Sequence, residues 1–270
     1  MEEPKTSRWK VHFASVAGVS HERVGLTCQD SVKVIRVGDI ICIAIADGAG
    51  SAEYAELASK VAVRSALMTL ASMPPIPSSE SATDMMLTAM HKSKAALLRA
   101  AGRRNVRPRD FATTLSLFVL APTFTVAVQV GDGGSVAYTE TKSAFTLLAP
   151  ARGEYTNETQ FLHDADITRD LKFASVPEPV TFMVAFTDGL LPVAMTQGAS
   201  EPFKPFTDSL KEFWASGNEG RQTKVALSTF LRSERLRERT SDDLSLVLAG
   251  QWNLSAKTMG NESGLQANQM

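Results

Sequence analysis

Cysteine is scarce in this sequence, because the 270 residues contain only Cys28 and Cys42. So low a count argues against a disulfide framework. Cys42 lies inside an apolar run, where a small buried thiol is expected, whereas Cys28 is close to Asp30 and could line a site. A chain of this length can bury a stable core without such cross-links.

Long apolar runs and an excess of basic charge are also absent. No stretch approaches the roughly 20 apolar residues that span a bilayer, and the opening MEEPKTSRWK is not an apolar signal segment. The formal net charge is −1, which argues against a general role at nucleic acids or membrane surfaces. The sequence therefore predicts a cytoplasmic protein that binds neither nucleic acid nor membranes.

Hydrophobic periodicity predicts consecutive groups of strands separated by pairs of helices. The predicted strands lie at 9–20, 30–38, 39–47, 111–121, 124–134, 135–140, 144–150, 180–189 and 242–250, and the predicted helices at 52–72, 80–101, 202–215 and 218–234. This order favours an α+β domain with antiparallel sheets over a parallel βαβ sheet, with helices on both outer faces.

One domain over residues 8–252 is the simplest division, and the polar composition of 253–270 predicts a disordered tail. Residues 150–175 are polar, irregular and too long for an ordinary connection, so we expect them to be functional. Three residues in this segment either shape a substrate-facing flap or belong to a self-packed surface loop: Glu154, Asn157 and Thr159.

Acidic residues mark the ends of several predicted strands. Three apolar runs end in the pairs Asp47-Gly48, Asp132-Gly133 and Asp188-Gly189. Asp242 and Asp243 instead open the last strand, and Asp30 precedes another. In antiparallel sheets the end of one strand lies beside the start of its neighbour, so these acids can gather on one rim.

Gathered carboxylates repel one another unless their pKa values rise or cations neutralise them. Oxygen ligands suit Mg²⁺ or Mn²⁺, and no Cys or His spacing suggests zinc. Two such ions can bridge a water, lower its pKa and screen a phosphoryl group. At Asp132 we favour a plain hairpin turn, because GDGG between two alternating runs is typical of one.

Six short motifs occur in an order that resembles a known family: CQD (28–30), ADGAGS (46–51), ATT (112–114), VGDGGS (130–135), FTDGL (186–190) and SDDLSLVLA (241–249). They are similar to the serial motifs of the metal-dependent protein phosphatases, type 2C, across about residues 11–249. The forms DGAGSA and RGEYTNETQFL resemble a bacterial-type branch of that family.

The resemblance implies a four-layer αββα sandwich, with two central antiparallel sheets flanked by helix pairs. It implies a serine/threonine protein phosphatase that hydrolyses phosphoserine or phosphothreonine by attack of a water or hydroxide bridging two Mn²⁺ or Mg²⁺ ions. The expected partners are a phosphorylated protein substrate and, as a further candidate, a cognate kinase. By this resemblance, Asp47 bridges the two metal ions, and the Gly48 carbonyl, Asp188 and Asp242 also bind metal. Asp30 contacts a metal-bound water. Two further residues, Asp243 and Gln29, are expected to support these ligands without binding a metal ion themselves.

The sequence departs from the family pattern at the phosphate-binding position, where Gly25 stands in place of an arginine. His21 or Arg23 could substitute, although His21 could also be a simple turn residue. Ala49 occupies the place of a family histidine, and no counterpart of a third-metal aspartate is present. Two alternatives therefore stay open: a catalytically weak pseudophosphatase that binds a phosphoprotein or kinase, and a two-metal nuclease, which the lack of a basic groove disfavours.

Overall fold

The structure is a computed structural model that describes residues 8–72, 76, 78–150, 159–196, 198, 201–216 and 220–252. Its strands form two antiparallel five-stranded sheets. Sheet A has the order β1 (Arg8–Val16), β10 (Leu244–Trp252), β9 (Val180–Phe186), β6 (Gly134–Thr139) and β7 (Phe145–Leu148). Sheet B has the order β2 (Ser31–Val37), β3 (Ile40–Ala46), β4 (Leu115–Leu120), β5 (Thr125–Val130) and β8 (Lys172–Val176).

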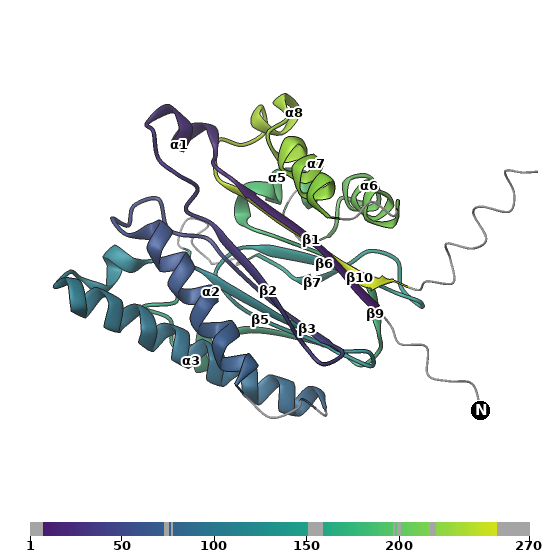
Figure 1. Cartoon of the computed structure of the whole chain (residues 1–270), viewed down its shortest axis with the longest axis horizontal. Coiled ribbons are helices and arrows are strands. Elements are labelled where there is room, and N and C mark those ends of the chain that lie inside the picture. The colour runs from purple at the N-terminus through teal and green to yellow at the C-terminus, as the bar shows by residue number, and fades with distance from the viewer. Residues whose placement is uncertain are drawn as a thin grey trace, which may run out of the picture.

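Helices cover the outer faces of both sheets (Figure 1). The long helices α2 (Ala55–Ala71) and α3 (Ser79–Arg104) pack on sheet B. Sheet A is covered by α5 (Leu191–Ala194), α6 (Lys204–Ala215), α7 (Arg221–Leu231) and α8 (Glu234–Arg237). The shorter elements are α1 (Val19–Arg23), α4 (Ile167–Asp170) and the 3-10 turns η1 (Pro108–Phe111) and η2 (Asp188–Leu190). This four-layer order confirms the predicted α+β fold class.

Strand β3 shows why the sheets are buried on both sides. All seven of its residues are buried, and alternate side chains enter different cores because successive side chains of a strand point to opposite faces. Ile41, Ile43 and Ile45 join the core between the two sheets. The smaller Cys42, Ala44 and Ala46 join the core beneath α2 and α3. Cys42 is therefore the buried core thiol that the sequence predicts, and both cysteines are free.

The structure differs from the sequence-based expectation in two segments. Residues 150–175 are not irregular throughout, because β8 pairs with β5 at the edge of sheet B. Its alternate residues Phe173 and Ser175 are exposed, because one face of this edge strand is open to solvent. The predicted helix over 218–234 is interrupted, since α7 ends at Leu231 and α8 begins at Glu234.

Three other expectations concern the C-terminal tail, the flap and membrane spans. The predicted tail, 253–270, and the flap candidates Glu154 and Asn157 lie outside the described residues. Among the helices that are described, none is both long and apolar enough to cross a membrane.

Candidate active site

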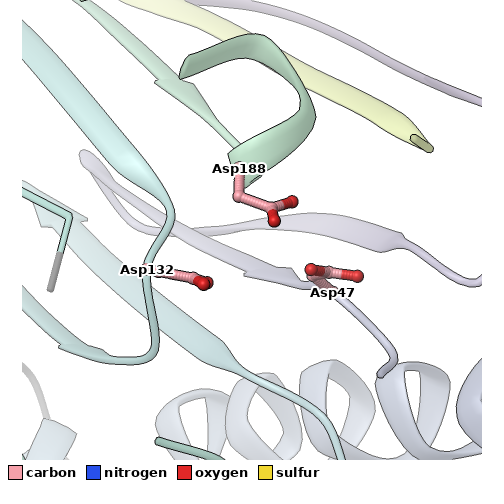
Figure 2. Close-up of side chains that lie close together, drawn as sticks. All are labelled: Asp47, Asp132 and Asp188. Atoms are coloured by element: carbon pink, nitrogen blue, oxygen red, sulfur yellow. The ribbon is translucent and has the colours of Figure 1, made fainter. Parts of the chain in front are cut away.

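Three aspartates from three strand ends point toward one another (Figure 2). Asp47 follows β3, Asp132 follows β5 and Asp188 follows β9. Each contributes a carboxylate oxygen, and the three oxygens lie within 4.8 Å of one another. Because β3 and β5 belong to sheet B and β9 belongs to sheet A, the cluster forms where the ends of the two sheets meet.

The structure corrects the interpretation of Asp132 as a hairpin residue. Strands β5 and β6 do not pair with each other, because the loop over 131–133 carries the chain from sheet B to sheet A. Gln129 Nε2 donates to the carbonyls of Gly131 and Gly133, at 3.0 and 2.8 Å, and fixes this crossing. The Asp-Gly pair after an apolar strand, shared with Asp47 and Asp188, is the sequence signal that could have found it.

The ATT motif holds the backbone of Asp47. The Thr114 hydroxyl accepts a hydrogen bond from Asp47 N at 2.9 Å, and Thr114 N donates to Asp47 O at 2.8 Å. The Thr113 hydroxyl donates to the same carbonyl at 2.7 Å. Because both threonines are buried, they position the end of β3 from the side of β4.

Gly48 is required by the close approach of backbone on both sides. A Cβ at this position would lie 2.5 Å from Ala55 O, at the start of α2, and 2.9 Å from Gln29 O. No side chain fits there without a shift of the backbone. The absence of a side chain therefore brings α2 and the segment that carries Asp30 against the end of β3.

Asp30 lies next to the three clustered acids and is buried. The Thr187 hydroxyl, one residue before Asp188, donates to Asp30 Oδ2 at 2.7 Å. Asp30 Oδ1 and Asp132 Oδ1 are buried without a hydrogen-bond partner. A buried carboxylate oxygen normally has a partner, so two such orphaned atoms indicate that something outside the chain completes the site.

Burial raises the pKa values of Asp30, Asp47 and Asp188. Burial is the main cause of a pKa of about 7 for Asp30 and of about 7 for Asp188. Burial, followed by the charges of Asp30 and Asp188, raises the pKa of Asp47 well above its ordinary value. Such a group of hard oxygen donors, with excess negative charge and orphaned atoms, fits divalent cations such as Mg²⁺ or Mn²⁺.

Asp242 is not one of the three acids that converge within 4.8 Å. Its Oδ1 accepts a hydrogen bond from Asp243 N at 2.8 Å. Its negative charge nevertheless raises the pKa values of both Asp47 and Asp188, so it lies close enough for its charge to act on the cluster. Direct contact of Asp242 with a metal ion stays a prediction.

Asp243 is buried and holds three segments together. Its carboxylate accepts hydrogen bonds from Gly18 N at 2.7 Å and Gln29 N at 2.6 Å. Nδ1 of His21 lies 2.8 Å from the same carboxylate. The charge of Asp243 raises the pKa of Asp30, so Asp243 lies near the acid cluster. A supporting role for Asp243 and Gln29 in the metal site stays a prediction.

The two phosphate-binding candidates differ in their surroundings. His21 is partly buried in α1 and is oriented by Asp243, whereas Arg23 is exposed and forms no ion pair with a described residue. The contact with Asp243 therefore orients His21, whereas no ion pair with a described residue orients Arg23.

One residue of the expected flap reaches the cluster. The Thr159 hydroxyl donates to Asp132 Oδ2.

Lys172, the first residue of β8, contacts the loop of Asp132. Its Nζ donates to Gly131 O and Ala149 O, at 3.0 and 2.9 Å, and burial lowers its pKa to about 8. The beginning of β8 is therefore hydrogen-bonded to the loop that carries Asp132, a role that the sequence did not predict.

Comparisons with known proteins identify the family of the chain and agree with its fold. Residues 17–232 match the sequence profile of the family described as protein phosphatase 2C. A relative, serine/threonine-protein phosphatase 3 of Escherichia coli (strain K12), is 29% identical over 255 residues, which cover 89% of this chain and 98% of the relative.

Solved structures share the fold at low sequence identity. Serine/threonine phosphatase Stp1 from Staphylococcus aureus has a TM-score of 0.65 and 12% identity, covering 93% of this chain and 98% of that one. PppA, titled a key regulatory component of T6SS in Pseudomonas aeruginosa, has a TM-score of 0.60 and 13% identity, covering 91% and 99%. The fold and the family match together define a phosphatase of the metal-dependent class. The chain belongs to the protein phosphatase 2C family and is a serine/threonine protein phosphatase.

Proposed function

We propose that residues 8–252 form a phosphatase domain that hydrolyses phosphoserine and phosphothreonine in proteins with the help of two Mn²⁺ or Mg²⁺ ions. The convergence of Asp47, Asp132 and Asp188 within 4.8 Å carries this proposal. The family match supports the use of metal ions. We infer that the substrate is a phosphorylated protein, and the kinase partner and cytoplasmic location expected from the sequence stay predictions.

The residues that would hold the ions include the three clustered aspartates. Asp47, Asp132 and Asp188 supply carboxylate oxygens, the Gly48 carbonyl and Asp242 are the further ligands expected from the sequence, and Asp30 would act through a water. When bound, such ions lower the pKa of a coordinated water and screen the charge of a phosphoryl group.

The protein itself holds two of these ligands, Asp47 and Asp132, in place through hydrogen bonds to their backbone and loop. Thr113 and Thr114 fix the backbone of Asp47 through three hydrogen bonds. Gln129 and Lys172 fix the loop of Asp132 through the carbonyls of that loop. This rigidity matters because ligands that are already positioned need little reorganisation when charge develops during the reaction.

We assign binding of the substrate phosphate to His21. Asp243 accepts the hydrogen bond of Nδ1, which leaves Nε2 as the nitrogen that can donate to a phosphoryl oxygen when the ring is protonated. A buried carboxylate that accepts from Nδ1 favours this orientation of the ring. His21 would then take the place of the family arginine, whose position holds the exposed Gly25.

The alternative of a weak pseudophosphatase rests on a specific observation. Ala49 replaces the family histidine and packs, buried, in a small apolar cluster with Ala52, Ala55 and Ala112. That position therefore offers no proton donor. The alternative predicts metal binding and phosphoprotein binding with little turnover.

Hydrolysis of a phosphothreonine peptide distinguishes these functions. The purified protein is assayed with Mn²⁺, with Mg²⁺ and with EDTA, beside the Asp47→Asn variant. The matched control is Asp84→Asn, because Asp84 is an exposed residue of α3. Metal-dependent release of phosphate that is lost in Asp47→Asn and kept in Asp84→Asn supports the proposal. Metal binding without turnover favours the pseudophosphatase, and cleavage of nucleic acid instead of peptide favours the nuclease.

A further inference from the structure

A pocket of about 820 Å³ lies among α5, α6, α7 and α8. These helices gather on the outer side of sheet A (Figure 1). The volume is within the range of about 300–1,000 Å³ that is typical of small-molecule sites. None of the clustered acids lines it, so the pocket is separate from the proposed active site.

The wall of the pocket is mainly apolar and only partly shielded from solvent. Leu210, Leu227 and Leu236 form its buried part. Phe203 and Phe230, which also line it, are 46% and 37% exposed. Large aromatic side chains that remain exposed around a concave surface often mark a binding site, because covering them removes apolar area from water.

Positive charge lines the same pocket. Arg235 and Arg239 are exposed lining residues, and no acidic side chain belongs to the described lining. Neither arginine forms an ion pair with a described residue, whereas their neighbour Arg237 pairs with Glu22 at 2.9 Å. The free guanidinium groups therefore complement an anionic head, and the phenylalanines and leucines complement an apolar body.

We propose that this pocket binds a small amphipathic anion, with one anionic head and an apolar body of medium length, and that its binding is coupled to the acid cluster. A macromolecular partner is not required, because the pocket has the volume of a small-molecule site. The arginines can contact the anionic head, and the phenylalanines and leucines can contact the apolar body.

The coupling follows from two segments that serve both sites. Pro192 and Val193 line the pocket and follow Asp188 through η2. Arg239 lines the pocket and directly precedes the turn that carries Asp242. A ligand that orders both walls restricts both acids, so metal binding to the already ordered cluster costs less conformational entropy.

Close backbone packing joins these two segments to each other. A Cβ on Gly189 would lie 2.2 Å from Asp243 O, so η2 and the start of β10 have no free space between them. Movement at either wall of the pocket is therefore transmitted to the other. The Arg237–Glu22 pair additionally ties α8 to α1, which carries His21.

Calorimetric titration with 1-decanesulfonate tests the binding. EDTA is present so that no metal ion can attract the sulfonate. We expect saturable binding that weakens about tenfold or more in Arg235→Glu/Arg239→Glu. Arg232→Glu is the matched control, because Arg232 is exposed at the end of α7 and does not line the pocket. Ser209→Trp, at an exposed lining position, should block binding by filling the pocket.

Several results overturn the binding. One is the absence of saturation up to about 1 mM decanesulfonate, a concentration that corresponds to a binding free energy of only about 4 kcal/mol. A second is equal affinity for the cation decyltrimethylammonium. A third is unchanged affinity for decanesulfonate in both the double arginine variant and Ser209→Trp. Binding is measured without any substrate, so failure of the proposed phosphatase reaction does not affect this outcome.

Titration with Mn²⁺ tests the coupling. Saturating decanesulfonate should raise the affinity for Mn²⁺ by about fivefold or more in the parent protein, and by linkage Mn²⁺ should raise the affinity for decanesulfonate equally. Ser209→Trp should lose the effect of decanesulfonate on Mn²⁺ binding. Decanesulfonate binding that leaves the Mn²⁺ affinity unchanged overturns the coupling.

Discussion

Oδ1 of Asp243 lies 2.8 Å from Nδ1 of His21, although 222 positions separate the two residues in the sequence. The contact joins the first turn after β1 to the start of β10, and these two strands are neighbours in sheet A. It gives an orientation to His21, which we propose as the replacement for the family arginine whose position holds Gly25. The pairing of β1 with β10 therefore creates a feature that neither segment contains alone.

Replacement of His21 should weaken recognition of phosphate and leave the metal site intact. We expect His21→Ala to lower kcat/KM for a phosphothreonine peptide by about tenfold or more, through loss of a charge-assisted hydrogen bond. Inhibition by inorganic phosphate should weaken in parallel, while Mn²⁺ affinity stays unchanged. Arg23→Ala is the control and should differ from the parent by less than about twofold. Unchanged phosphate inhibition in His21→Ala would remove His21 from the phosphate site.

Asp132 should be a metal ligand and not a turn residue. Asp132→Asn removes one negative charge from the cluster, so we expect the affinity for Mn²⁺, measured by calorimetric titration, to fall about tenfold or more. Asp84→Asn controls for the loss of one acid on the exposed surface of α3. Equal Mn²⁺ affinity in Asp132→Asn and the parent would return Asp132 to the role of an ordinary loop residue.

The metal-free protein should lose stability as the pH rises. The pKa values of Asp30 and Asp188 are about 7 in the folded protein, against an ordinary value of 3.8. A raised pKa means that the folded state binds the proton more tightly, so the associated stability is present at low pH and disappears as the pH rises through about 7. In EDTA, the free energy of unfolding should therefore be lower at pH 8 than at pH 5.

Asp188→Asn isolates one part of that pH effect. The amide cannot ionise, so we expect the variant in EDTA to exceed the parent in stability by about 1 kcal/mol or more at pH 8 and by much less at pH 5. Urea denaturation at the two pH values measures the difference. An identical loss of stability in the parent and Asp188→Asn would contradict the raised pKa. Added Mn²⁺ should reverse the order of the two proteins at pH 8.

Thr114 should stabilise the end of β3 through its hydroxyl group. Thr114→Val leaves Asp47 N without its partner at 2.9 Å, and an unsatisfied buried N–H costs about 1–3 kcal/mol. Thermal denaturation should show a lower Tm for Thr114→Val. Thr114→Ser keeps the hydroxyl group and should restore most of the Mn²⁺ affinity lost in the valine variant. Equal metal affinity in the valine and serine variants would show that this hydrogen bond does not position Asp47.

Gly189 and Gly102 should respond in opposite directions to replacement by alanine. A Cβ at Gly189 would lie 2.2 Å from the backbone of Asp243, whereas a Cβ at Gly102 in α3 meets nothing within 4 Å. We expect Gly189→Ala to destabilise the fold by about 1–3 kcal/mol through overpacking. Gly102→Ala should stabilise it by about 0.5–1 kcal/mol. Urea midpoints measure both changes, and a neutral Gly189→Ala would argue against tight packing of η2 on β10.

Much of the fold could be predicted because its elements carry strong local patterns. The unbroken apolar run of β3 predicts a strand covered on both faces, and the helical spacing over 52–72 and 80–101 predicts α2 and α3. β8 was missed because it is a five-residue strand that places Phe173 on its exposed face, so its sequence lacks the alternation of polar and apolar residues that predicts a strand. Helix α7 was predicted too long because residues 232–233, which separate it from α8, carry neither Gly nor Pro.

By itself, the sequence determined the order of most of the strands and long helices and the identity of the acids that follow three of the strands, because hydrophobic periodicity and Asp-Gly pairs are local signals. Only the tertiary structure decided which acids meet. Asp132 joins Asp47 and Asp188 because the loop after β5 crosses from one sheet to the other, and the same Asp-Gly sequence would be an ordinary turn if β5 and β6 paired. Strand pairing is a non-local property that depends on which faces can be buried together. The same holds for His21, whose orientation exists only because β1 and β10 lie side by side.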